Sequence, residues 1–160
     1  MKKMLVLMLT MVLVVVLSAC SKEETVAIEA SKSPKEMIDQ MLTEIEQPSL
    51  MELSEEEIKN LYNIDPAKLE AYSVRIPMMN VKSNEIAIFK VKDAADVAEV
   101  KTAVETRAEN VMKTFEVYLP DQYEQAKNYK VVVKGNYVLF VISDRADEFV
   151  KVYDSFFEQK

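Results

Sequence analysis

Two apolar segments around a turn signal constrain the fold of this chain more than any other feature. Residues 129–134 and 137–143 flank Gly135-Asn136, and a glycine in the first of two turn positions is typical of a type II′ β-hairpin. Pairing Lys134 with Tyr137 places one apolar set on a single face, which we expect to be the core face: Tyr129, Val131, Val133, Val138, Phe140 and Ile142.

The opposite face of this predicted hairpin is also partly apolar. It carries Val132, Leu139 and Val141 among lysines. Two interpretations remain open: N-terminal helices cover part of this face, or it is a docking surface.

Two helices are predicted ahead of the strands, because each begins with a capping box. Ser33 and Glu36 start a helix that continues to about residue 46, and Ser54 and Glu57 start a shorter one that ends near Asn63. Apolar residues recur at spacings of three and four in both segments, so each helix has a face to bury.

The middle of the chain predicts two strands and a long helix. Residues 71–76 alternate with period two as far as Pro77, and residues 85–92 form a second strand. Asp93 is placed to cap a helix of about five turns, and Asp144 to cap a final helix after the hairpin.

The segments Asn84–Asp96 and Asn136–Asp147 run in parallel along the chain, each with an Asn, an apolar strand and an Asp-rich helix start. The order strand, strand, helix would then occur twice, as an internal repeat. Coincidence explains the pattern equally well. The predicted fold is α+β: a four-stranded, mainly antiparallel sheet with two helices on one face, preceded by the two N-terminal helices.

The N-terminal end has the layout of a secretory signal peptide. Lys2 and Lys3 precede an uncharged apolar run from 4 to 17, which is short for a membrane-spanning helix, although an uncleaved anchor is the alternative. The run closes on Leu17, Ser18, Ala19 and Cys20, a sequence that looks like a bacterial lipobox, in which the cysteine is lipidated.

The predicted organisation has three parts. Residues 1–19 are a signal peptide, residues 20–32 are the lipidated cysteine and a flexible tether, and residues 33–160 are a single domain. Two or three acyl chains would hold such a protein stably on the membrane.

Composition excludes several function classes. The chain has no histidine, and its one cysteine is assigned to the anchor, so triad catalysis, disulfides and nearly all zinc sites are excluded. A single glycine excludes glycine-rich phosphate loops, and a net charge of −7 argues against nucleic acid as a partner. We predict no cofactor, no metal and no catalytic residue.

One loop holds the most site-like residues. Residues 118–128 contain Tyr118, Asp121, Gln122 and Tyr123, which are predicted to contact a ligand or partner because loops often carry function. The alternative is that the aromatic side chains are packed against the domain. A single helical turn is expected to begin at Pro120.

The chain resembles bacterial lipoproteins that carry the domain of unknown function 4358. The resemblance rests on the lipobox leader, Asn84–Ala87, Tyr118–Glu124 and Lys134–Ser143, and covers roughly residues 33–157. It implies a surface lipoprotein of a Gram-positive bacterium and assigns no catalytic residue.

The predicted function is therefore a lipid-anchored, non-enzymatic binding or interaction module on the outer face of the cell membrane. Its partner would be an envelope protein or a small ligand. The alternatives are a cell-envelope hydrolase that uses a carboxylate pair and a small substrate-capturing lipoprotein, for which a single domain of this size is short.

Overall fold

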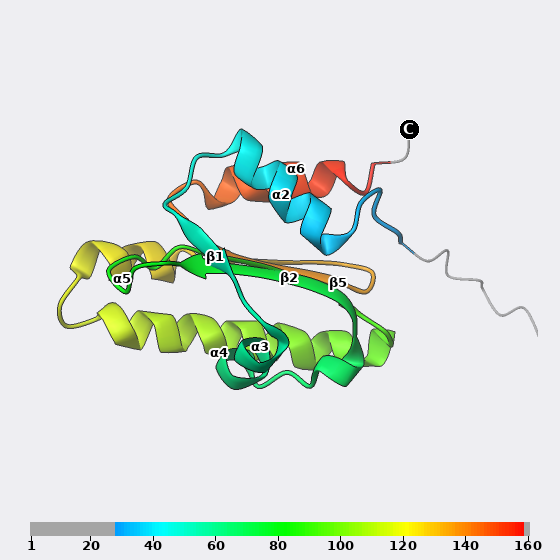
Figure 1. Ribbon diagram of the computed structural model, residues 1–160, viewed down its shortest axis with the longest axis horizontal. Helices are drawn as coiled ribbons and strands as arrows, with labels where there is room; N and C mark the ends of the chain where they lie inside the picture. Colours follow the sequence, from blue (N-terminus) through cyan, green and yellow to red (C-terminus); the bar gives the residue numbers. More distant parts are fainter. Residues whose placement is uncertain (1–27, 159–160) are drawn as a thin grey trace, which may run out of the picture.

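The computed structural model describes residues 28–158, in which a sheet lies between two layers of helices (Figure 1). The α-helices and strands of these residues, in chain order, are α2 (Pro34–Glu44), β1 (Leu50–Glu52), α3 (Glu55–Tyr62), β2 (Leu69–Pro77), β3 (Glu85–Val91), α4 (Val97–Phe115), α5 (Pro120–Lys127), β4 (Lys130–Lys134), β5 (Tyr137–Ile142) and α6 (Ala146–Ser155). The predicted α+β class is confirmed.

The sheet has five antiparallel strands in the order β1-β2-β3-β5-β4, so the prediction of four strands was wrong. The additional strand is β1, which pairs with the end of β2 through Met51 and Ile76. Because β1 has three residues and two of them are exposed, it shows no alternation that a sequence pattern could reveal.

The C-terminal hairpin forms with the predicted register. Lys134 pairs with Tyr137, Val133 with Val138 and Val131 with Phe140, and Gly135 has a φ of +54°. A positive φ at the first turn residue favours glycine, as the type II′ prediction requires. Val133 nevertheless remains 40% exposed, because β4 is an edge strand.

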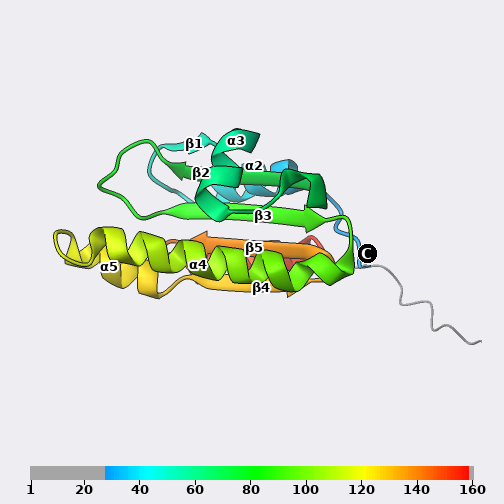
Figure 2. The ribbon, with the colours of Figure 1, turned by 90° about the horizontal axis from the view of Figure 1, so that it is seen from below.

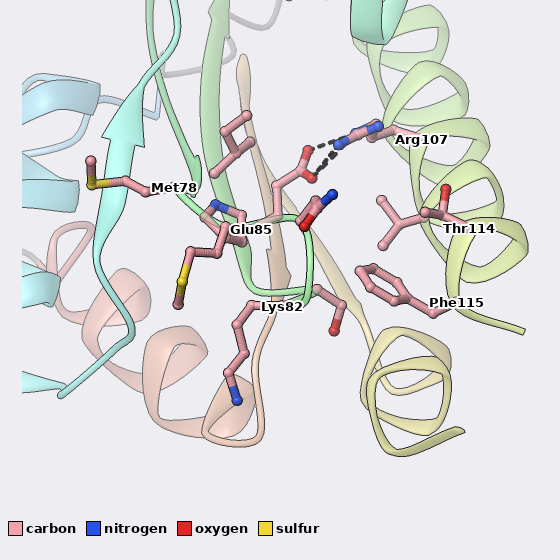
Figure 3. Close-up of a pocket in the computed structure, with 12 residues that line it drawn as sticks. Met78, Lys82, Glu85, Arg107, Thr114 and Phe115 are labelled. Carbon is pink, nitrogen blue, oxygen red and sulfur yellow. Dashed lines mark hydrogen bonds and ion pairs between the residues drawn. The ribbon is translucent and has the colours of Figure 1, made fainter. Parts of the chain in front are cut away.

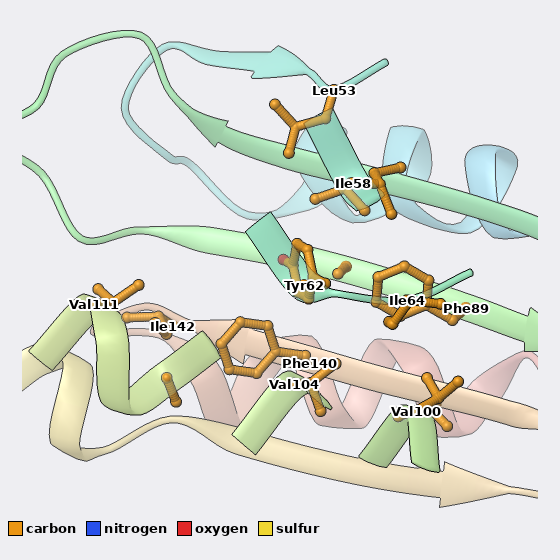
Figure 4. Close-up of a cluster of buried hydrophobic side chains, with 14 of the residues drawn as sticks. Leu53, Ile58, Tyr62, Ile64, Phe89, Val100, Val104, Val111, Phe140 and Ile142 are labelled. Carbon is orange, nitrogen blue, oxygen red and sulfur yellow. The ribbon is translucent and has the colours of Figure 1, made fainter. Parts of the chain in front are cut away.

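Two separate cores fill the space on the two sides of the sheet. On one side α3, α4 and α5 pack over Phe89 and Phe140, and this cluster is the α4-side core (Figure 4). On the other side α2 and α6 pack over Ile88 and Leu139, which form the α6-side core. Figures 1 and 2 show the two helical layers on opposite faces.

The predicted placement of both long helices on one face was wrong, because α4 and α6 lie on opposite faces. The strands β2, β3, β5 and β4 do follow the order of a repeated hairpin, but the helix after each hairpin does not repeat its position. The apolar second face of β5 is buried under α2 and α6, so the interpretation of that face as a docking surface is also wrong.

Local capping explains where two of the five described α-helices begin. Ser33 and Ser54 form the predicted capping boxes with Glu36 and Glu57. Asp93 accepts a hydrogen bond from the Ala95 amide in a 3₁₀ turn that leads into α4.

The predicted cap at Asp144 was wrong. No side chain caps α6, and the Ser143 hydroxyl instead accepts a hydrogen bond from the Arg145 amide at 3.0 Å. This contact is a local turn that precedes the helix and does not cap it.

The segment before α2 lies against the domain. Glu29 accepts hydrogen bonds from Lys90 Nζ (3.0 Å) and from the Tyr137 hydroxyl (2.8 Å), and the Ser31 amide donates to the Phe156 carbonyl (2.8 Å). The end of the predicted tether is therefore part of the folded surface. The predicted signal peptide, lipobox and Cys20 lie outside the described residues, and no helix within residues 28–158 combines the length and apolarity that crossing a membrane requires.

Tyr153 provides a test of the α6-side core. Its side chain is fully buried, and its hydroxyl has no hydrogen-bond partner among residues 28–158. Replacing Tyr153 by Phe removes an unsatisfied polar group, so we expect the free energy of unfolding to rise by about 1 kcal/mol in urea denaturation. Tyr137→Phe is the matched control, because it removes a hydroxyl that donates to Glu29, and we expect a loss of about 1 kcal/mol. Equal losses in both variants would contradict this description of the core.

Candidate functional site

A pocket of about 350 Å³ opens between the β2–β3 loop and the C-terminal half of α4 (Figure 3). The end of β2 and its loop supply one wall, and two turns of α4 supply the other. The lining residues are Ile76, Pro77, Met78, Met79, Asn80, Lys82, Ser83, Glu85, Arg107, Val111, Thr114 and Phe115.

An ion pair forms the polar part of this pocket. Arg107 Nη2 donates to Glu85 Oε2 at 2.8 Å, and Arg107 Nε donates to Glu85 Oε1 at 2.9 Å. The Tyr62 hydroxyl donates a further hydrogen bond to Glu85 Oε1. The Glu85 side chain is 2% exposed and that of Arg107 is 17% exposed, so the carboxylate is the more deeply buried partner.

The pKa values of Tyr62 and Arg107 are both raised in this cluster. Burial and the Glu85 carboxylate raise the pKa of Tyr62 well above its ordinary value, so the phenol remains a donor. Burial alone would lower the pKa of Arg107, but the hydrogen bonds and charge of Glu85 outweigh it and raise that pKa. The Tyr62 phenol and the Arg107 guanidinium therefore both keep their protons beside the Glu85 carboxylate.

The sequence contains a partial signal for this pair. Glu85 is the first residue of β3 and lies in phase with Ala87 and Phe89, which face the α4-side core. A carboxylate at an inward-facing strand position needs a partner. Arg107 gives no such signal, because it lies at the edge of the buried stripe of α4, where charged residues are common.

Exposed apolar residues gather on two loops at the end of the domain that holds the pocket, and two of them, Met78 and Met79, line it. Met78, Met79 and Val81 belong to the β2–β3 loop, and Val117 and Tyr118 belong to the loop between α4 and α5; each is at least 45% exposed. We call these five residues the apolar rim. Both views show the two loops at the end of the domain opposite the start of the described chain (Figures 1 and 2).

A polar network holds the base of the β2–β3 loop. Gln122 Oε1 accepts a hydrogen bond from the Ser83 amide at 2.9 Å. Gln125 Nε2 donates to Ser83 Oγ and Asn84 Oδ1, and Asn84 Nδ2 donates to Gln47. Helix α5 thus fixes the loop at Ser83, while the loop residues with exposed methionines project into solvent.

The structure separates the four residues predicted as a ligand contact. Gln122 is 6% exposed and is used in the network, and Tyr123 packs against the α4-side core. Tyr118 is in the apolar rim, with its hydroxyl 3.5 Å from the Asn80 carbonyl. Asp121 is exposed, and the hydrogen bond from Gln122 Nε2, with the charge of Lys82, holds the pKa of Asp121 below its ordinary value. The four residues thus lie in different environments, and Tyr118 lies near the pocket through its contact with Asn80, a lining residue. Their contact with a ligand or partner stays a prediction.

No group of three or more potential metal ligands occurs in the part of the chain that the structure describes.

Comparison with known proteins gives one match. The family model described as "Domain of unknown function (DUF4358)" matches residues 43–143, a span that contains every residue of the pocket. No curated protein and no solved structure matches the chain.

The buried Glu85–Arg107 ion pair leads to a prediction about the stability of the domain. Arg107→Met leaves the Glu85 carboxylate buried without its cation, and we expect the free energy of unfolding to fall by about 3 kcal/mol in urea denaturation at pH 7. The double variant Glu85→Gln with Arg107→Met should recover at least half of that loss, since the remaining amide is neutral and keeps an acceptor for Tyr62. If the double variant is less stable than Arg107→Met alone, the pair does not have the energetics described here.

Proposed function

Since the chain belongs to the family of the domain of unknown function 4358, a description that assigns no activity, we propose its function from the geometry of the pocket. The domain is a non-catalytic binding module, and the pocket between the β2–β3 loop and α4 is its binding site. The observation that carries this proposal is a concave site with an ion pair inside it, which is lined by the exposed side chains of Met78 and Met79 from the apolar rim. Exposed apolar residues gathered at a pocket mouth are typical of binding surfaces.

The chemistry of the pocket supports binding over hydrolysis. Acid–base hydrolysis of glycosides ordinarily uses two carboxylates across the scissile bond, whereas the pocket is lined by one, Glu85. That carboxylate already accepts hydrogen bonds from Arg107 and Tyr62, so it has little capacity left to act on a substrate.

We further propose that the domain is anchored to the outer face of the cell membrane of a Gram-positive bacterium through a lipid on Cys20. The lipobox Leu17-Ser18-Ala19-Cys20 supports this location. The described chain starts beside the β4–β5 turn, where a side-chain atom of Ile28 lies close to Gly135. Helix α4 has 19 residues, about 28 Å of helix, and runs from that end of the sheet toward the pocket (Figure 2). The pocket would then face away from the membrane, toward the envelope.

The anchor is tested by changing its cysteine. In a Gram-positive host fed radiolabelled palmitate, we expect the protein to become labelled and to remain in the membrane fraction. Cys20→Ala should abolish the label and release the protein. Ser21→Ala is the control, since it alters the neighbouring residue and leaves the thiol intact. Labelling that persists in Cys20→Ala would contradict lipidation at this residue.

The binding site is tested with a neutral apolar probe. When benzyl alcohol is added to protein with ¹³C-labelled methionine methyl groups, we expect the signals of Met78 and Met79 to shift at lower probe concentration than that of Met51. Met51 is the matched control, because it is 40% exposed on β1 and does not line the pocket. Equal shifts at all three methionines would mean general apolar adsorption and would contradict the proposed site.

A further inference from the structure

The pocket differs in charge from the protein around it. The chain carries a net charge of −7, whereas the side chains that line the pocket include two cations, Lys82 and Arg107, and one anion, Glu85. Glu85 is paired with Arg107, so the charge of Lys82 remains in excess within the lining set. A positive site in an acidic protein favours an anionic ligand.

Arg107 retains hydrogen-bonding capacity toward such a ligand. Its Nε and Nη2 atoms donate to Glu85, and within residues 28–158 its Nη1 atom donates to no protein acceptor. Glu85 has little capacity left to accept a hydrogen bond from a ligand, because Tyr62 and Arg107 already donate to its two oxygens. The pair therefore offers a donor to a ligand rather than an acceptor.

The remaining lining residues include three uncharged polar ones, Asn80, Ser83 and Thr114, and two apolar sides. Ile76 and Pro77 form one side, and Val111 and Phe115 form the other. A volume of about 350 Å³ accommodates a small ligand or one large side chain of a peptide. The methionines at the rim adapt their shape to an apolar group because their side chains are unbranched and flexible.

We propose that the pocket binds a monocarboxylate with an apolar body, whose carboxylate accepts hydrogen bonds from Arg107 and attracts Lys82 while its body lies between β2 and α4. This inference rests on the proposed function, because it identifies the ligand class of the same pocket. Two sources share this chemistry: a free aliphatic or aromatic acid, and the C-terminal carboxylate of a peptide that ends in an apolar residue.

One acidic neighbour acts against this preference. Asp121 lies close enough to Lys82 to feel its charge, but it is exposed, it does not line the pocket, and its carboxylate accepts a hydrogen bond from Gln122. Lys82 and Asp121 are both exposed, so solvent screens both charges, and Arg107, 17% exposed, is the cation that acts from inside the pocket.

The inference is tested by comparing a carboxylate with its neutral isostere. 3-Phenylpropanoate and 3-phenylpropanamide differ at one end, and we expect the carboxylate to bind about tenfold more tightly at pH 7 in NMR titrations that follow the methyl groups of Met78 and Met79. The peptide acetyl-Ala-Ala-Phe and its C-terminal amide form the second pair. If the acid is preferred only between 3-phenylpropanoate and its amide, the ligand class is a free acid. If the peptide acid binds more tightly than 3-phenylpropanoate, the ligand class is a peptide C-terminus.

Variants then identify the groups responsible. The double variant Glu85→Gln with Arg107→Met removes the donor without leaving a buried charge, and it should lose the tenfold preference while still binding the amide. Lys82→Met, at an exposed position, should reduce the preference about threefold and weaken its dependence on salt. Arg145→Met is the control, because it removes a cation on the opposite helical layer that is paired with Glu148.

The outcomes separate this inference from the proposed function. Equal binding of the acid and the amide in the pocket would overturn the carboxylate assignment and leave the binding site in place. Absence of any shift at Met78 and Met79 with all four probes would overturn both. Full preference for the acid in the double variant would also overturn the inference, because Arg107 would then have no part in recognition.

Discussion

The fold depends on one physical constraint: the two central strands are apolar on both faces. All six residues of β5 are buried, and β3 is buried except at Lys90. A sheet with this property needs cover on each side, since one exposed face would leave Leu139 and Val141 in water. The chain meets the requirement with α2 and α6 on one side and α3, α4 and α5 on the other. Its single cysteine leaves it without an internal disulfide, so these two cores must hold the domain.

The features that were predicted from the sequence are those that depend on near neighbours. Capping boxes at Ser33 and Ser54 act over three residues, and the register at Gly135 follows from a two-residue turn. The errors concern relations between distant segments. Whether α6 lies on the same face as α4 depends on α2, which is about a hundred residues away, and the edge strand β1 exists only because Met51 meets Ile76. The local sequence pattern indicates neither the contact between α2 and α6 nor the pairing of Met51 with Ile76.

The residues of the candidate site show the same difference between features that depend on near neighbours and features that depend on distant segments. Glu85 falls at an inward-facing position of a predicted strand but was not singled out, and its partner Arg107 is 22 residues away on a helix that was predicted without any role for that residue. Residues 118–128 were predicted as a loop with one helical turn and were singled out for their composition, whereas the structure forms the eight-residue helix α5 there and uses Gln122 to fix the β2–β3 loop at Ser83. Residues that look functional in sequence can thus hold in place the residues that line a pocket. The exposed methionines gave no signal, since a Met-rich connector resembles any other loop until its exposure is known.

The energetics of the Glu85–Arg107 ion pair are relevant to why this pocket contains charged residues. A buried pair contributes little net stability, because the cost of removing two charges from water offsets most of their attraction, and an apolar pair of similar volume is often equally stable. Stability alone therefore gives no reason for Glu85 and Arg107 to interrupt the α4-side core. The pair lies where the core meets the pocket, with the carboxylate 2% exposed and the guanidinium 17% exposed. Tyr62 donates to Glu85, and Glu85 in turn holds the guanidinium in one orientation; under the proposed binding function, a ligand would then not have to order a flexible cation.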